Sequence, residues 1–500
     1  MDMEDKAKDI LDKLQKDDVE EFVPVCMEYL GIKVVAGKLV VPADSPAMSM
    51  PKTSLAQIYV NLAIFFHMYG QAELAYCLYL EACRMLKSLP VVWKSYSYSL
   101  FLLHYLFISK EENFLRHKAY NGLFKDVWQF SHNKELHRKH KKIRLGYLSS
   151  DFRKHVVLLF SWVMLTKYNK ERFELYCFST NEEDGNCTEE IKKYVDVWIS
   201  LRDMIAPEAA KEIYTREIDI LFELGGHATN NLPILAYKPA PVQICGIGYF
   251  ATTGLKTVDY FLTDKYLMQN GGDRYFVEKM IVMTQTHFCF SPINNMPQVV
   301  KGAPCKKNGY ITFGSMNDPL KINDVVLETW SAILSKVPGS RLLLKGRSLG
   351  KKYGVDTMLR RLQKAGISED RVELQKFTVP YLPVYWDIDI MLDTFPYPGG
   401  GTTCDALYMG VPVITLGDGS HGGDFGISLL KNLKLEECCT YTREEYIERA
   451  VLLASDTDLL DILHRSIRNM FENSPLRDEA AYMQELERKY EEIWEKYLRD

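Results

Sequence analysis

The sequence lacks long apolar runs, a strong excess of charge of either sign, and a paired cysteine framework. Its longest apolar runs, such as Val156–Leu165, are about half the length that a membrane-spanning helix needs. A formal charge of −5 over 500 residues gives no electrostatic reason to expect nucleic acid as a partner. The 11 cysteines are scattered, which favours a reducing compartment, and the acidic, helical pattern of residues 1–21 is unlike a signal peptide. We therefore expect a soluble cytoplasmic protein without a membrane span.

Residues 387–418 carry the most informative pattern, which reads as strand, glycine loop, helix and strand. The loop and the start of the helix contain, in order, Gly399, Gly400, Gly401, Thr402 and Thr403. Glycines let a ligand approach the backbone closely, and free N–H groups at a helix N-terminus attract anions. The segment therefore predicts a phosphate-binding site.

The first part of the chain, residues 1–141, is predicted to be mostly helical, with a small hairpin over residues 32–41. Small residues recur where two antiparallel helices must touch, at Ala63, Gly70, Ala75 and Ala82. This pattern resembles one tetratricopeptide unit. Only one good copy is present, so a helical hairpin within an all-α domain is the alternative interpretation.

From Lys142 onward, short apolar strands alternate with amphipathic helices, which predicts an α/β fold with parallel sheets covered on both faces. A segment rich in Pro, Gly and Asn, residues 291–309, interrupts the alternation and is interpreted as a hinge. We expect one Rossmann-like domain over 142–300, a second over 301–475, and a C-terminal amphipathic helix over 476–500. Ligands should bind at the carboxyl ends of the strands, where the two domains face each other.

Six ordered sequence blocks resemble the family-41 glycosyltransferases, the O-GlcNAc-transferase-like enzymes, in their bacterial form. The blocks are 145–155, 219–231, 238–254, 259–264, 313–323 and 387–418. The resemblance covers about residues 140–500. It implies the GT-B arrangement of two facing Rossmann-like domains, a UDP-sugar donor, and inverting transfer to Ser or Thr of proteins.

The resemblance also implies a donor site. Lys321 takes the position of the lysine that holds the diphosphate, although a lysine after a strand is more commonly a solvated surface residue. Gly400, Gly401, Thr402 and Thr403 would offer further donors to the diphosphate. Asp405 would accept from the ribose hydroxyls; as a first-turn acid it also complements the helix dipole.

Other donor-side positions match the family less uniformly. Asn317 matches, whereas Asp318 stands where an amide is usual and is expected to point away or to cap the next helix. Tyr381 stands at the position of a base-stacking histidine, and a tyrosine can also stack on uracil. Lys376 and Phe377 would offer backbone contacts to the uracil edge.

On the acceptor side, His155 is implied at the active centre, either as a general base or as a residue that orients the acceptor. His227 follows another strand and is predicted to contact the sugar or a phosphate. The chain departs from the family at Phe250–Ala251, where Pro-Gly is usual, and at Asp424, where arginine is frequent. Because of these departures, the resemblance does not determine which sugar is transferred or which kind of acceptor receives it.

The motifs DID (387–389) and DTD (456–458) resemble a metal signature of other glycosyltransferases, but Lys321 and the helix start already offset the diphosphate charge. We expect no metal and no cofactor. The predicted reaction is transfer of GlcNAc or a related hexose from UDP to a protein or peptide, with flagellin as a candidate acceptor. The alternatives are an Asn-hexosyl or fucosyl transferase, a non-catalytic tetratricopeptide-like adaptor, and a sugar-phosphate epimerase.

Overall fold

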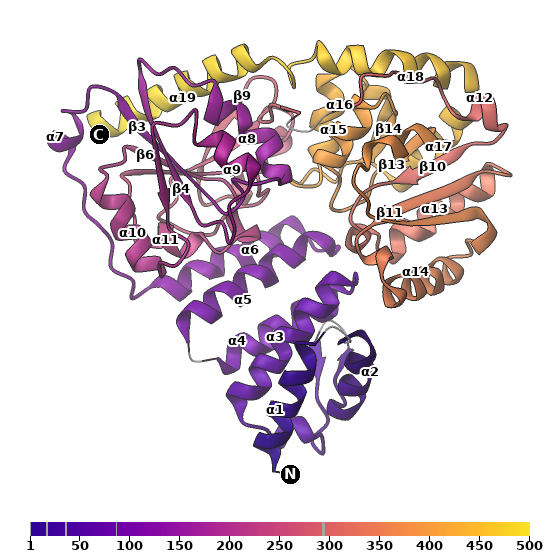
Figure 1. The fold of residues 1–500 in the computed structure, drawn as a ribbon, viewed down its shortest axis with the longest axis horizontal. Coiled ribbons are helices and arrows are strands. Elements are labelled where there is room, and N and C mark those ends of the chain that lie inside the picture. The colour runs from indigo at the N-terminus through magenta and orange to yellow at the C-terminus, as the bar shows by residue number, and fades with distance from the viewer. Residues whose placement is uncertain (1, 17–18, 36–37, 87, 293–295) are drawn as a thin grey trace.

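A computed structural model describes residues 2–16, 19–35, 38–86, 88–292 and 296–500. A helical arm leads into two α/β domains that lie side by side, and the last helix, after α18 of the second domain, lies over the first domain (Figure 1). The predicted hairpin is present as the antiparallel pair β1 and β2, although its turn lies outside the described residues, as do residues 293–295 of the predicted hinge.

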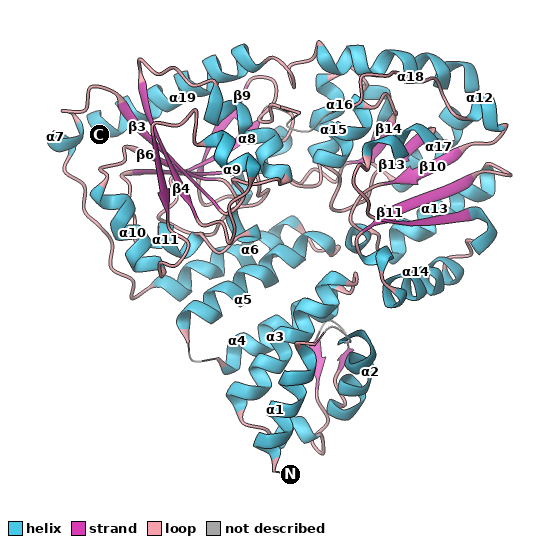
Figure 2. Ribbon diagram, viewed as in Figure 1, coloured by secondary structure: helices cyan, strands magenta, loops and turns pink. Residues whose placement is uncertain are grey.

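The arm is built from helices, with one small strand pair (Figure 2). Its elements are α1 (Met3–Leu14), α2 (Val19–Leu30), β1 (Lys33–Val35), β2 (Lys38–Val40), η1 (Pro46–Ser49), α3 (Lys52–Met68), α4 (Ala72–Met85), α5 (Leu89–Leu102), η2 (Leu103–Tyr105), α6 (Lys110–Ala119), η3 (Tyr120–Phe124) and α7 (Lys134–His137).

The expected helical hairpin of the arm is formed by α3 and α4, which are joined by residues 69–71 and pack on each other. Ala63, Ala75 and Ala82 are fully buried between the helices of the arm. Small side chains at these positions let the helix backbones approach closely, as both interpretations of the sequence require.

The first domain contains a seven-stranded sheet in which every pairing is parallel, in the order β5-β4-β3-β6-β7-β8-β9. The strands are β3 (Ile143–Ser149), β4 (Phe173–Ser179), β5 (Val197–Ser200), β6 (Ile220–Glu223), β7 (Val242–Cys245), β8 (Tyr260–Asp264) and β9 (Lys279–Met283). The connecting helices are α8 (Val156–Thr166), α9 (Asn186–Ile191), α10 (Ala206–Thr215), η4 (Gly226–Ala228), α11 (Leu232–Ala236) and η5 (Gln269–Tyr275).

The second domain contains a six-stranded parallel sheet in the order β12-β11-β10-β13-β14-β15. The strands are β10 (Thr312–Ser315), β11 (Arg341–Gly346), β12 (Val372–Lys376), β13 (Ile390–Leu392), β14 (Val413–Leu416) and β15 (Cys439–Thr440). The helices are α12 (Cys305–Asn308), η6 (Pro319–Lys321), α13 (Asp324–Lys336), η7 (Ser348–Gly350), α14 (Lys352–Lys364), η8 (Glu369–Arg371), η9 (Leu382–Asp387), α15 (Gly401–Tyr408), α16 (Phe425–Asn432), η10 (Glu436–Cys438), α17 (Arg443–Ser455), α18 (Thr457–Glu472) and α19 (Glu479–Arg499).

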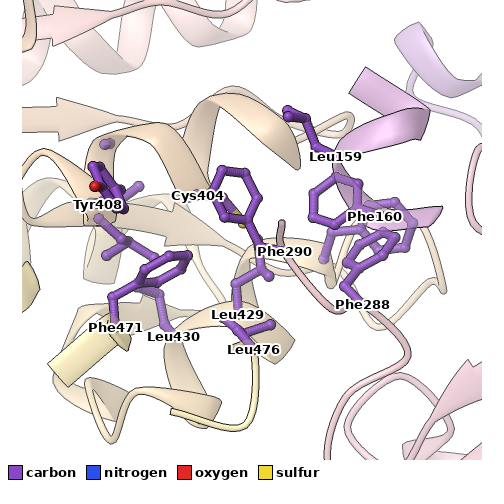
Figure 3. Close-up of a cluster of buried hydrophobic side chains, with 14 of the residues drawn as sticks. Leu159, Phe160, Phe288, Phe290, Cys404, Tyr408, Leu429, Leu430, Phe471 and Leu476 are labelled. Carbon is purple, nitrogen blue, oxygen red and sulfur yellow. The ribbon is translucent and has the colours of Figure 1, made fainter. Parts of the chain in front are cut away.

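A shared hydrophobic core joins the two domains on one side of their junction. Phe160 of α8 stacks on Phe288 with ring centroids 4.2 Å apart, and Phe290 meets Phe471 of α18 at 5.5 Å. Figure 3 shows these rings in one cluster with side chains of α15 and α16. Because buried aromatic rings dominate the energetics of such contacts, this cluster fixes how the carboxyl ends of the two sheets face each other.

The last helix, α19, belongs to the second half of the chain but packs on the first domain. It contacts α8 and β9, and its Tyr490 hydroxyl lies 3.2 Å from that of Tyr147 in β3. None of the described helices, α19 included, is both long enough and apolar enough to cross a membrane.

Candidate active site

Lys321 lies at the carboxyl end of β10, on the short turn η6. Its Nζ donates to the Pro398 carbonyl oxygen at 2.7 Å and lies 3.6 Å from the centre of the Tyr397 ring. Asp318 caps this turn by accepting from the Leu320 N–H at 3.0 Å, one of the two positions expected for it. Burial lowers the pKa of Lys321 to about 8, against the opposing effect of nearby carboxylates. The site therefore holds one desolvated cation.

Asp393, which directly follows β13, organises the loop around this lysine. Its Oδ1 accepts from Asn317 Nδ2 at 3.1 Å and from the Gly399 N–H at 2.7 Å, and its Oδ2 accepts from Thr415 Oγ1 at 2.9 Å. Burial raises the pKa of Asp393. The carboxylate thus ties the glycine loop to the ends of β10 and β14, a role that the sequence analysis did not assign to it.

The glycine loop ends at the N-terminus of α15, as expected. Thr402 Oγ1 donates to Asn317 Oδ1 at 3.0 Å, and Thr403 Oγ1 donates to the Gly399 carbonyl oxygen at 3.1 Å. No atom outside its immediate neighbours lies within 4 Å of the place where a Cβ on Gly400 would be. The backbone at Gly400 therefore borders open space that a ligand can fill.

The N-termini of α8 and α15 meet across the domain junction. A Cβ on Gly401 would lie 2.5 Å from Cγ2 of Val156, the first residue of α8. Each helix N-terminus carries a partial positive charge and unpaired N–H groups. Two such ends beside the Lys321 ammonium make this point of the junction suited to a diphosphate.

His155 is the residue that precedes α8. Its Nδ1 accepts from the Val157 N–H at 3.4 Å, which caps the helix, and also lies 3.4 Å from Asp151 Oδ1. Burial lowers the pKa of His155, and Arg153 and Arg347 lower it further, against the effect of Asp151. Val156, the next residue in the chain, lies against Gly401 of α15, so His155 borders the second domain. In the alternative tautomer, with Nδ1–H toward Asp151 instead of accepting from Val157, Nε2 carries the lone pair that a general base needs.

Buried Asp405 pairs with half-buried Tyr381 beside the glycine loop. The Tyr381 hydroxyl donates to Asp405 Oδ2 at 2.7 Å. Burial raises the pKa of Asp405 to about 7, although the tyrosine bond opposes the shift. Burial and the neighbouring carboxylate also raise the pKa of Tyr381. The carboxylate predicted to accept ribose hydroxyls is thus already bound by a hydroxyl of the protein.

Lys376 and Phe377 lie at the end of β12, close to this pair. The Lys376 carbonyl oxygen accepts from Lys345 Nζ at 2.8 Å, and the Phe377 N–H donates to the Gly346 carbonyl oxygen at 3.1 Å. The Phe377 ring lies 5.6 Å from the Tyr381 ring. The Arg347 guanidinium lies 5.4 Å from the centre of the Phe377 ring. Arg347 was not predicted, because its nearness to Phe377 depends on the order of the strands.

The structure does not bring His227 to this site, which corrects the predicted contact with sugar or phosphate. His227 is fully buried, with Nδ1 2.6 Å from Ser97 Oγ of α5 and Nε2 2.9 Å from the Thr253 carbonyl oxygen. Both ring nitrogens are therefore used within the protein. Sequence position alone could not reveal this, because the partner helix comes from the arm.

A cavity of about 290 Å³ lies where the arm meets both domains. Its walls include His104 and Lys110 from the arm, Phe250 from the first domain, and Tyr397 from the second. The Phe250 ring packs 4.4 Å from His104 and 4.6 Å from Tyr397. Phe250, one of the departures from the family pattern, thus shapes a cavity that shares Tyr397 with Lys321.

The two acidic motifs have structural partners. Asp389 of DID is fully buried and accepts from the Cys305 and Thr312 N–H groups, each at 2.8 Å. Asp456 of DTD caps α18 by accepting from the Leu459 N–H at 2.9 Å. Asp389 and Asp456 are thus each bonded to backbone N–H groups of the protein.

Comparison with known proteins places the chain in a family. The model of glycosyl transferase family 41 matches residues 98–309 and 302–486. The probable UDP-N-acetylglucosamine–peptide N-acetylglucosaminyltransferase SPINDLY of Petunia hybrida is 34% identical over 371 residues, which are 71% of this chain and 39% of that protein. The similarly named protein SEC of Arabidopsis thaliana is 27% identical over 71% of this chain and 37% of its own length.

A mutant of the Thermobaculum terrenum O-GlcNAc transferase superposes with a TM-score of 0.81 at 27% identity, over 91% of this chain and 86% of that one. This likeness and the two parallel sheets confirm the predicted GT-B arrangement with a helical N-terminal region. The chain spans about two fifths of the length of the curated plant relatives. The chain belongs to glycosyl transferase family 41.

Proposed function

We propose that this protein is an inverting, metal-independent glycosyltransferase that moves GlcNAc or a related hexose from a UDP-sugar to Ser or Thr of a protein or peptide. Membership of family 41 and the names of its plant relatives support the donor and the peptide acceptor. The observation that carries the proposal is the meeting of two helix N-termini beside Lys321.

Breaking the bond between sugar and phosphate leaves negative charge on the diphosphate of UDP. Lys321 Nζ is held by one carbonyl oxygen at 2.7 Å, and the backbone at Gly400 borders open space. Both groups are fixed before the donor arrives, so they need no reorganisation when the charge develops. Asp405 would receive the ribose hydroxyls and Tyr381 would stack on the uracil.

The acceptor hydroxyl would attack the anomeric carbon from the side opposite the diphosphate. His155 Nε2 would take the hydroxyl proton or orient the hydroxyl. The cavity bounded by the arm and both domains is the proposed docking site for the acceptor chain. We propose a cytoplasmic acceptor, with flagellin as a candidate.

The test measures nucleotide release from a panel of UDP-sugars and GDP-fucose, together with UDP binding by calorimetry. We expect one UDP-sugar to be hydrolysed slowly, and Lys321→Ala to reduce the rate by about 10²–10³-fold, as for other lost oxyanion contacts. Lys336→Ala, at the exposed end of α13, is the matched control. The proposal fails if the protein neither binds UDP nor releases it, or if Lys321→Ala has no effect.

The acceptor is tested by the intact mass of flagellin co-expressed with the enzyme or with Lys321→Ala. We expect a mass increase of one or more hexosamine or hexose units with the wild type alone, and fragmentation that places the sugar on Ser or Thr. A sugar attached to Asn would instead support the alternative of an Asn-hexosyl transferase. Unchanged mass would remove flagellin as the acceptor and leave donor hydrolysis to be judged separately.

A further inference from the structure

Two histidines and an aspartate meet at the end of the first sheet that lies away from the candidate active site. His137 ends α7, His140 lies in the turn before β3, and Asp219 directly precedes β6. Because β3 and β6 are parallel neighbours, their amino ends are adjacent. The side chains of His137, His140 and Asp219 are 4%, 8% and 0% exposed. The cluster is therefore buried and separate from the donor site at the carboxyl ends.

The ligand atoms of this cluster converge. His137 Nδ1 lies 2.6 Å from Asp219 Oδ1, and His140 Nδ1 lies 3.0 Å from each oxygen of the same carboxylate. Metal–ligand bonds of about 2.0–2.1 Å in a tetrahedral site place ligand atoms about 3.3 Å apart. The distances from Asp219 to His137 Nδ1 and to His140 Nδ1 would become about 3.3 Å after movements of well under 1 Å. Among the described residues, no other group of three His, Cys, Asp or Glu side chains converges in this way.

The surroundings of His140 supply an outer partner for a metal ligand. Each ring nitrogen faces a carboxylate, with Nε2 3.3 Å from Glu217 Oε2 and Nδ1 3.0 Å from Asp219. With Nδ1 on a metal ion, Nε2–H would donate to Glu217. That pairing of a ligand histidine with an outer carboxylate is typical of metal sites.

We propose that His137, His140 and Asp219 bind one zinc ion through two imidazole nitrogens and one carboxylate oxygen. This donor set suits Zn²⁺, and water would complete a tetrahedral shell. The Arg144 N–H donates to Asp219 Oδ2 at 2.8 Å and fixes the carboxylate while Oδ1 faces both histidines.

The zinc ion would have a structural role. The His137 ring lies 5.8 Å from that of Trp494 in α19, and Arg138 Nη2 donates to the Leu498 carbonyl oxygen at 2.7 Å. The site thus joins the connection from the arm, the amino end of the sheet, and the C-terminal helix. Metal binding to the folded chain stabilises it by mass action.

The experiment uses full-length protein without a polyhistidine tag, stripped with a chelator and then titrated with Zn²⁺. We expect one zinc per chain by mass spectrometry of the metal after gel filtration, and a higher thermal midpoint. Glu217→Gln should weaken zinc binding about 10–100-fold, and His140→Gln should abolish it. His132→Gln is the matched control, because His132 lies beside the cluster with its Nε2 bonded to the Lys238 carbonyl oxygen at 2.9 Å.

The contrary result is a wild-type chain that retains no more zinc than His140→Gln at saturating Zn²⁺. The cluster would then be a hydrogen-bonded network around Asp219, and the proposal would be overturned. If the variants do not fold, Co²⁺ added to the stripped wild type gives the answer. The intense visible absorption of tetrahedral cobalt supports the site, and its absence refutes it.

Discussion

Donor affinity is predicted to pass through a maximum near pH 7.5, because Asp405 and Lys321 must both be charged for the donor to bind. Burial raises the pKa of Asp405 to about 7 and lowers the pKa of Lys321 to about 8. Ribose hydroxyls need the ionised Asp405 carboxylate as acceptor, and that form is lost as the pH falls through 7. The diphosphate needs the Lys321 ammonium, which the free protein loses as the pH rises through 8.

The size of the effect follows from these two values. About 60% of the free protein carries both charges at pH 7.5, and about 9% does so at pH 6 or at pH 9. The apparent affinity scales with the fraction of the competent form. We therefore expect the donor to bind about sixfold more weakly at pH 6 and at pH 9 than at pH 7.5.

Calorimetric titration with an intact UDP-sugar measures this profile. UDP itself is unsuitable, because its terminal phosphate titrates with a pKa of about 6. Asp405→Asn should abolish only the fall in affinity below pH 7.5, the acid limb of the profile. Lys321→Ala should abolish only the fall above pH 7.5, the alkaline limb. A wild-type affinity that is constant from pH 6 to pH 9, or limbs that survive in both variants, would refute the reasoning.

Three further substitutions test the geometry. Gly400→Ala should leave the thermal midpoint unchanged and weaken UDP binding, whereas Gly401→Ala should also lower the midpoint because its Cβ meets Val156; equal effects in both assays would contradict this. Tyr381→Phe removes a charge-assisted hydrogen bond to Asp405 that is worth about 1.5–3 kcal/mol. The affinity for UDP-sugar, measured by calorimetry, should therefore rise about tenfold or more. Unchanged or weaker binding would show that the bond persists in the complex. Phe160→Ala at the domain junction should cost about 3–5 kcal/mol in chemical denaturation, with the exposed Phe107→Ala as control, and a loss below about 1 kcal/mol would argue against a shared core.

Much of the fold could be predicted from apolar strands alternating with helices, and the physical reason lies in burial. The strands β3, β4 and β11 lie inside their sheets, so their sequences are mostly apolar and indicate strands clearly. The strands β5 and β9 form the two edges of the first sheet. Edge strands are paired on one side only, and β5 has no fully buried residue, so their sequences carry a weaker signal.

The site was predicted where the resemblance supplied positions and was missed where tertiary contacts decide. Lys321, Asn317 and Thr402 do lie within one hydrogen-bonded group. Asp393 and Tyr397 belong to the same group, but nothing in their local sequence indicates that one holds the glycine loop and the other stacks on the lysine. Such roles depend on which strand ends are neighbours, and strand order cannot be read from periodicity.

The burial of His227 changes the view of the acceptor wall. By bonding Ser97 of α5 and the Thr253 backbone, His227 fixes the last part of the arm to the first domain. The arm also contacts the second domain. Lys110 Nζ donates to the carbonyl oxygens of Asp418 and Gly419 at 3.3 and 3.1 Å, and the Tyr105 ring packs 5.1 Å from that of Tyr397. The arm therefore connects the two domains at the cavity, so a substitution that loosens His227 should alter the cavity as well as the arm.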